Sequence, residues 1–277
     1  MTRRRTYLYF AIGGVVNLTK LQRDFIRRLI GWTAFGIMVV LLVWCGIEIR
    51  HANRMSHATR TKTSFAQVSL ALHNYHDTYG SYPPAFIVDE NGKPMHSWRV
   101  LILPFVDGAE LYSAYDFHEP WNGPNNSKLT HRMPETFRSY TEPKSTSYTN
   151  IVVITGPDTA FPGAKSTRLQ DFRDGGENTI MLAEIANSRI PWLAPVDLSV
   201  ETMSFRVNDP HQLGISSANW RQPYVKFASG PTYELNGTLT PESLKALTTI
   251  SGGERITRED LLVNGQLLGT RIGQLSR

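Results

Sequence analysis

The longest apolar stretch of the chain lies near its N-terminus, where residues 29–47 contain no charged side chain. A helix rises about 1.5 Å per residue, so these residues would span roughly 28 Å, close to the hydrocarbon thickness of a bilayer. Tryptophans stand near both ends, at Trp32 and Trp44, and basic residues flank the stretch on both sides. Aromatic and cationic flanks of this kind are typical of membrane spans. The pattern predicts a transmembrane helix over residues 29–47.

The apolar pattern continues beyond this stretch with the spacing of an amphipathic helix. Five residues recur three and four positions apart on one helical face, namely Phe65, Val68, Leu72, Tyr75 and Tyr79. Upstream the same face is polar, for example at Arg54 and Thr61, so we expect the helix to be solvated there and buried only over its last four turns. Gly80 stands where a C-terminal cap belongs, and the two prolines that follow prevent the helix from resuming.

Short strands and turns are predicted for the rest of the chain. Apolar or β-branched stretches that predict strands occur at residues 98–106, 150–156, 178–186 and 223–230. Residues 240–253 predict a helix with Thr240 as its N-cap, and Asn264-Gly265 predicts a hairpin over residues 261–268. The expected fold class is α+β, with a long N-terminal helix packed on a small antiparallel sheet with long loops.

Charge is distributed unevenly along the chain. Residues 1–62 hold eleven of the 29 Lys and Arg residues and two of the 24 Asp and Glu residues, a net charge of +9, which leaves −4 for residues 63–277. A mildly acidic body lacks the basic face that neutralises phosphates, so we expect no nucleic-acid partner. The single cysteine, Cys45, excludes an intrachain disulfide and a CxxC motif.

The charges beside the apolar stretch also predict its orientation. Seven Lys and Arg residues precede it and four follow within fifteen residues, which favours a cytoplasmic N-terminus. We therefore expect a basic cytoplasmic or interfacial arm at residues 1–28, the transmembrane helix at 29–47, its amphipathic continuation at 48–80, and an extracytoplasmic α+β domain at 81–277. The protein would be a single-pass protein of the inner (cytoplasmic) membrane that contacts the lipid bilayer through residues 29–47.

Two histidines are the first candidates for chemistry. His73 and His76 are three residues apart and share a helix surface, which is a spacing that can hold a metal ion. A metal site needs a third ligand, and Asp77 points to a different sector of the helix from His73. A solvated or domain-facing helical surface is the better interpretation of this pair.

Two loops resemble ligand sites without matching their motifs. Residues 156–167 contain glycines, Lys165 and Ser166 as a phosphate-binding loop does, but the spacing differs and two prolines remove backbone N–H donors. Four oxygen-bearing residues that surround a Gly-Gly pair are weak calcium candidates, namely Asp171, Asp174, Glu177 and Asn178. A tight turn requires the same residue types for backbone reasons alone.

Catalytic motifs give no stronger signal. The chain has no Gly-x-Ser-x-Gly elbow, and its cysteine lies inside the predicted span. Four histidines lie near acidic residues in sequence, at His96, His118, His131 and His211, but adjacency along the chain does not establish geometry. We expect no enzymatic activity and no cofactor, with a membrane-tethered hydrolase or a calcium-dependent binding module as the alternatives.

Several stretches of the chain resemble one large family of bacterial proteins with a pilin-like N-terminal helix and a C-terminal domain of unknown function. They run in the family's order at residues 70–85, 96–126, 148–163, 169–198 and 240–254. The resemblance implies a fold like that of type IV pilins and type II secretion pseudopilins, and other envelope or pilin-like proteins as partners. It implies no catalytic residue.

Two features depart from the family's pattern. Prepilin-type members have a cleavage-site glycine five residues before a glutamate, whereas Glu48 is preceded at that distance by Val43. Members also carry an Asp-Gly-Ser motif on a late strand, where this chain has Ala228-Ser229-Gly230. We therefore expect a structural or interaction role in the cell envelope or a secretion-related assembly, with a processed pseudopilin subunit as the alternative.

Overall fold

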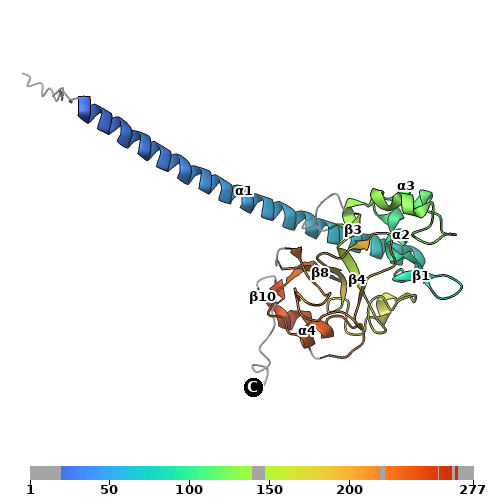
Figure 1. Ribbon diagram of the computed structural model, residues 1–277. Helices are drawn as coiled ribbons and strands as arrows, with labels where there is room; N and C mark the ends of the chain where they lie inside the picture. Colours follow the sequence, from blue (N-terminus) through green and yellow to red (C-terminus); the bar gives the residue numbers. More distant parts are fainter. Residues whose placement is uncertain (1–19, 139–146, 219–221, 255, 264–265, 268–277) are drawn as a thin grey trace, which may run out of the picture. The chain divides into compact units, whose positions relative to one another are not determined.

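Residues 20–138, 147–218, 222–254, 256–263 and 266–267 are described by the computed structural model (Figure 1). The chain divides into two units, Met1–Arg54 and Met55–Arg277. The α-helices are α1 (Lys20–Tyr79), α2 (Trp98–Leu101), α3 (Ala109–Ala114), α4 (Pro241–Ala246) and α5 (Arg258–Leu261). Short 3₁₀ helices are η1 (Leu103–Phe105), η2 (Asn126–Arg132), η3 (Glu135–Phe137) and η4 (Leu169–Asp171).

Helix α1 is a single element of 60 residues, so the apolar stretch and its predicted amphipathic continuation belong to one helix. Gly80 ends it with a φ of 78°, and the Gly80 N–H donates to the carbonyl oxygen of His76 at 2.7 Å. A residue without a Cβ adopts this left-handed conformation at little cost, which is why glycine caps helices.

The buried face of α1 differs at both ends from the predicted stripe. Phe65, Val68 and Leu72 are fully buried, as expected, whereas Tyr79 is 60% exposed. Thr61 is fully buried, so the prediction that this face is solvated at Thr61 is wrong. Burial begins one turn earlier than the apolar residues indicate, because a small polar side chain can also lie against the body.

Within the described residues, eleven short strands follow α1. They are β1 (Phe86–Val88), β2 (Pro94–Ser97), β3 (Tyr148–Thr149), β4 (Ile151–Thr155), β5 (Ile180–Glu184), β6 (Ile190–Pro191), β7 (Leu198–Ser199), β8 (Tyr224–Phe227), β9 (Thr232–Leu235), β10 (Leu262–Val263) and β11 (Gln266–Leu267). Seven of them form a sheet in the order β10-β11-β9-β8-β5-β4-β7, and β1-β2 and β3-β6 form two-stranded sheets. The pairs β4-β7 and β11-β9 are parallel, so the main sheet is mixed rather than purely antiparallel.

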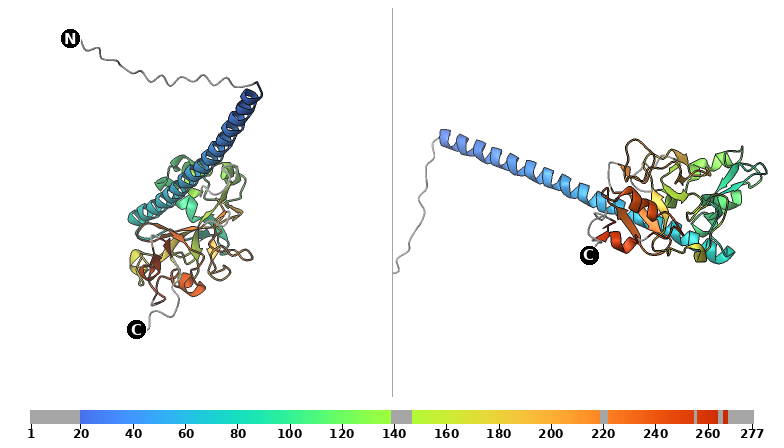
Figure 2. Two further views of the ribbon diagram at one scale, coloured as in Figure 1. Left: turned by 90° about the vertical axis from the view of Figure 1, so that its left-hand side faces the viewer. Right: turned by 90° about the horizontal axis from the view of Figure 1, so that it is seen from below.

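The sheet of the second unit is covered on both faces. Ile151 of β4 belongs to the core cluster that contains Phe65 of α1, whereas its neighbour Val152 belongs to the cluster that contains Leu244 of α4. Successive side chains of a strand point to opposite faces, so the two clusters are the two sides of one sheet. Both views in Figure 2 show the C-terminal part of α1 alongside the strands. This arrangement confirms the α+β fold class.

Residues 98–106 do not form the predicted strand. They form α2 and η1, with Ser97 as the N-cap whose side chain accepts a hydrogen bond from the Arg99 N–H. A short continuous apolar stretch does not distinguish a buried strand from a buried helical turn. The serine cap and Pro104 decided the outcome locally, since both favour helical turns at these positions.

The late elements follow the predictions with one correction. Strands β10 and β11 pair as a hairpin, and Thr240 caps α4 by accepting a hydrogen bond from the Ser243 N–H. Helix α4 ends at Ala246, six residues before the predicted Gly252-Gly253 stop. The residues between return along the body, where the Ile250 N–H donates to the carbonyl oxygen of Asp158 at 3.0 Å.

Candidate functional site

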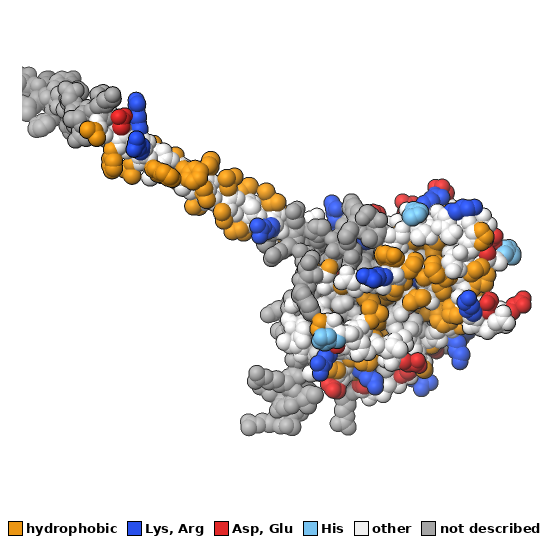
Figure 3. Space-filling model, viewed as in Figure 1, with side chains coloured by type: hydrophobic (Ala, Val, Ile, Leu, Met, Phe, Trp, Pro, Cys, Tyr) orange, Lys and Arg blue, Asp and Glu red, His pale blue; other side chains and the backbone are white. Residues whose placement is uncertain are grey.

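The exposed apolar surface of α1 is the clearest candidate for a functional site. Its window Arg27–Arg50 is long and apolar enough to cross a membrane, and none of that window is buried. Figure 3 shows hydrophobic side chains along this part of the helix with basic side chains at each end. Among the described residues this is the one helix with that length and composition. A surface of this kind is stable only where something other than water covers it.

Both ends of the window carry the side chains that anchor spans at the membrane interface. Trp32 and Trp44 are 73% and 60% exposed, and Arg27, Arg28 and Arg50 are exposed as well. Indole rings favour the depth of the headgroups, and arginines extend to the water on each side.

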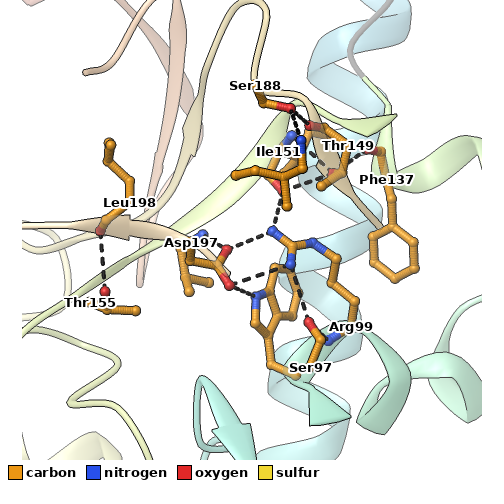
Figure 4. A network of polar contacts seen from close by, with 12 residues as sticks. Ser97, Arg99, Phe137, Thr149, Ile151, Thr155, Ser188, Asp197 and Leu198 are labelled. Atoms are coloured by element: carbon orange, nitrogen blue, oxygen red, sulfur yellow. Dashed lines mark hydrogen bonds and ion pairs between the residues drawn. The ribbon is translucent and has the colours of Figure 1, made fainter. Parts of the chain in front are cut away.

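A buried ion pair joins Arg99 of α2 to Asp197, directly before β7 (Figure 4). Arg99 Nη2 lies 2.6 Å from Asp197 Oδ1, and the two side chains are 0% and 2% exposed. The carboxylate also accepts hydrogen bonds from Trp98 Nε1 at 3.1 Å and from the Val153 N–H at 3.0 Å. It therefore connects α2 to the middle of β4.

The guanidinium has further partners within the same network. Arg99 Nη2 donates to the carbonyl oxygen of Ile151 at 3.2 Å, and Nη1 donates to Ser97 Oγ at 3.1 Å. Burial raises the pKa of the Asp197 carboxyl, while the charge of Arg99 and two N–H donors act in the opposite direction. A buried pair with these contacts fixes one packing arrangement of α2 on the sheet. The one local signal of this pair in the sequence is that Arg99 is the single charge within residues 98–106, and its partner is far away along the chain.

A second buried group lies in β2. His96 Nδ1 lies 2.9 Å from the hydroxyl oxygen of Tyr115, and its ring packs edge-on against Phe117. Burial lowers the pKa of His96, and a hydrogen bond to the Phe117 backbone and the charge of Asp116 partly oppose this shift. His96 is thus an interior residue whose burial favours the neutral form of its ring.

The polar residues of the loop that follows serve its backbone. Asn126 Nδ2 donates to the carbonyl oxygen of Asp116 at 2.8 Å, and Asn126 Oδ1 accepts from the Asp116 N–H at 2.9 Å. Glu119 Oε1 accepts from the N–H groups of Asn125 and Asn126 at 2.7 and 2.6 Å. These hydrogen bonds between side chains and backbone hold the loop in one conformation.

His73 and His76 face the body through the ring of Tyr82. Their ring centroids lie 5.7 and 4.8 Å from that of Tyr82, and His73 Nδ1 lies 2.7 Å from the carbonyl oxygen of Ser69. Burial raises the pKa of Tyr82 to about 12, with a smaller contribution from Asp77. Within the described residues no group of three or more His, Cys, Asp and Glu side chains is placed to hold a metal ion.

Residues 156–167 form a packed loop beside the segment that follows α1. The N–H groups of Tyr82 and Ala85 donate to the carbonyl oxygens of Thr167 and Gly163, both at 2.8 Å. Lys165 is exposed. The carbonyl oxygens of this loop thus bind residues 82–85. A phosphate-binding loop instead has free backbone N–H groups that point toward the phosphate.

Three of the four calcium candidates have backbone partners. Asp171 Oδ2 accepts from the Arg168 N–H at 2.7 Å, Asp174 Oδ1 from the Gly253 N–H at 3.1 Å, and Asn178 Oδ1 from the Arg258 N–H at 3.0 Å. Asp174 Oδ2 is buried and accepts no hydrogen bond within the described part of the chain. The Glu177 carboxylate lies against Gly175. The calcium interpretation stays a prediction.

The other three candidate histidines, His118, His131 and His211, are at the surface. His118 Nδ1 is 3.0 Å from Asp116 Oδ1, and His131 Nδ1 is 3.5 Å from Ser147 Oγ. His211 lines a hollow of about 410 Å³ together with Asn187 and Asn208, which adopt positive φ angles of 51° and 56°. The Asp209 carboxylate in this wall accepts from Ser204 Oγ at 2.6 Å, which lowers the pKa of Asp209.

Comparison with known proteins gives one match. A family model described as "Protein of unknown function (DUF1559)" matches residues 59–153, so the chain is similar to that family from the C-terminal turns of α1 into β4. No curated protein and no solved structure matches the chain.

Proposed function

We propose that this chain is a membrane-anchored, pilin-like protein with a structural or interaction role in the cell envelope or in a secretion-related assembly. The exposed apolar window of α1 carries the proposal. Each Å² of apolar surface left in water costs about 25 cal/mol, so a bilayer is the environment that stabilises this helix. The match to a family of unknown function is compatible with this role.

The proposed topology is single-pass in the inner membrane, with a cytoplasmic N-terminus and an extracytoplasmic body. It is supported by the excess of Lys and Arg before the span. Protease added to cells with a permeabilised outer membrane should digest the body while an N-terminal tag stays protected. A body that is cut only after the inner membrane is lysed would show the reverse orientation.

A processed pseudopilin subunit is the second candidate. The uninterrupted 60 residues of α1 favour it, since pilin-type subunits are built on one long N-terminal helix. Val43 at the position expected for the cleavage glycine argues against processing. Mass spectrometry of the purified N-terminus decides between the two candidates, because intact residues 1–30 would rule out prepilin processing.

The proposed role involves no catalysis. A calcium-dependent binding module is an alternative, and one specific observation supports it. That observation is the buried Asp174 Oδ2, which accepts no hydrogen bond from the residues that the structure describes. Calcium at this loop would satisfy the oxygen and raise the melting temperature, since a ligand that binds only the folded state stabilises it. A melting temperature that is the same with calcium and with a chelator removes this alternative.

A further inference from the structure

The apolar stripe of α1 begins before the membrane span. Leu21, Phe25 and Leu29 follow one another at intervals of four residues and are 85%, 67% and 53% exposed. Residues four apart lie on one helical face, so the stripe leads from the first turn of α1 into the window that starts at Arg27. An apolar stripe beside a basic face is the pattern of helices that lie at the depth of lipid headgroups.

The charge of these first turns is strongly positive. Residues 20–28 contain four Lys and Arg residues and one acidic residue, Asp24, for a net charge of +3. The corresponding nine residues at the other end of the span, 46–54, contain two arginines and Glu48, for a net charge of +1. The N-terminal end of the anchor is therefore the end that attracts anions.

A hollow lies where the charged turns meet the span. It has a volume of about 470 Å³ and is lined by Arg28, Gly31, Trp32 and Phe35. No atom lies within 4 Å of the place where a Cβ of Gly31 would be, so the glycine leaves a notch in the helix surface. The rings of Trp32 and Phe35 form its apolar wall, with their centroids 6.4 Å apart.

We propose that residues 20–35 form a binding site for anionic phospholipids. The Arg28 guanidinium would hold the lipid phosphate, while Arg27 adds positive charge beside it and the notch over Gly31 takes the glycerol and the first acyl carbons. The site rests on the proposed membrane anchoring and specifies which lipid the anchor prefers. It is continuous with the span and complementary in charge to an anionic headgroup.

The test measures lipid preference of the full chain. The chain is reconstituted into vesicles of phosphatidylcholine with a minor share of phosphatidylglycerol, purified again, and its retained lipids are quantified by mass spectrometry. The double variant Arg27→Gln/Arg28→Gln should lower the enrichment of phosphatidylglycerol roughly 25-fold, about fivefold for each arginine. The matched control Arg50→Gln, at the other end of the same span, should keep the enrichment.

Flotation of the vesicles after alkaline extraction separates this inference from the proposed anchoring. A wild-type chain that floats but retains both lipids in their bulk ratio overturns the lipid site and leaves the anchor intact. A loss of enrichment of about fivefold in Arg50→Gln, as expected for one arginine of the double variant, also overturns it, because the preference would then come from basic charge at either end. A chain that does not float overturns the anchor and the lipid site together.

Discussion

Arg99 and Asp197 show how much one buried charge depends on its partner. Neither side chain reaches water, and the carboxylate has N–H donors from α2 and β4. Two charges of this kind contribute little net stability as a pair, but each becomes costly when the other is removed. The main effect of the pair is therefore to favour one packing arrangement of α2 on the sheet over others.

Replacement of Asp197 by alanine should lower the free energy of unfolding by about 3–5 kcal/mol, because it leaves Arg99 buried and unpaired. Urea unfolding of the full chain in mild detergent, followed by tryptophan fluorescence, measures the loss. Arg132→Ala is the matched control, since it breaks the exposed pair with Glu110 and should cost no more than about 1 kcal/mol. Equal losses in the two variants would contradict the role assigned to the buried pair.

His96 makes stability depend on pH. Its pKa is lowered in the folded state by burial, so the unfolded chain takes up the proton first when the pH falls. The contribution of His96 to stability should be fully present above the pKa that it has in the unfolded chain, about 6.5, and should decrease as the pH falls below that value. Melting temperatures between neutral and mildly acidic pH measure this slope.

The variant His96→Gln should make the melting temperature depend less on pH, since it removes a group that binds a proton more readily in the unfolded state at mildly acidic pH. The exposed His211→Gln serves as its control and should keep the slope. A slope that survives in His96→Gln would assign the effect to another group.

At the scale of elements, α1 combines an apolar window and an amphipathic end in one helix. The first is set by composition and the second by the three- and four-residue spacing of Phe65, Val68 and Leu72. Gly80 then ends the helix in a conformation that other residues adopt only with strain.

Gly80→Ala should destabilise the protein by about 1 kcal/mol because of its φ of 78° alone, as no atom lies within 4 Å of the added Cβ. Gly237 also has open space around it and no such φ, so Gly237→Ala is the matched control. Thermal unfolding of both variants gives the difference. Identical melting temperatures would show that the cap conformation contributes nothing.

At the scale of the whole molecule, the window of α1 and the core of the body are separate sources of stability. The chain divides between Arg54 and Met55, and the two core clusters lie in the second unit. Changes in the window should therefore act on membrane association and changes in the core on unfolding.

The variant Val40→Arg places a charge near the centre of the window, where it costs about 2.5–3.5 kcal/mol of insertion. We expect a smaller alkali-resistant membrane fraction with an unchanged melting temperature of the body. Ala52→Arg, on the same helix beyond Arg50, should retain the wild-type membrane fraction. If Val40→Arg lowers the melting temperature as much as Asp197→Ala does, the two sources are not separate.

The sequence by itself determined the features that depend on local pattern. The apolar window, the helix end at Gly80, strands β4, β5 and β8, and the hairpin at β10 and β11 all follow from residues close to one another in the chain. Backbone geometry and apolar spacing act over a few residues, so a local pattern is sufficient to predict them.

Only the tertiary structure decided the rest. The Ser97 cap of α2 is local, but the burial of Arg99 depends on a carboxylate 98 positions along the chain. The parallel pairing of β7 with β4 and the burial of Thr61 likewise depend on segments that meet only in the folded chain. Contacts between distant residues are set by the packing of the whole core, and no local pattern encodes them.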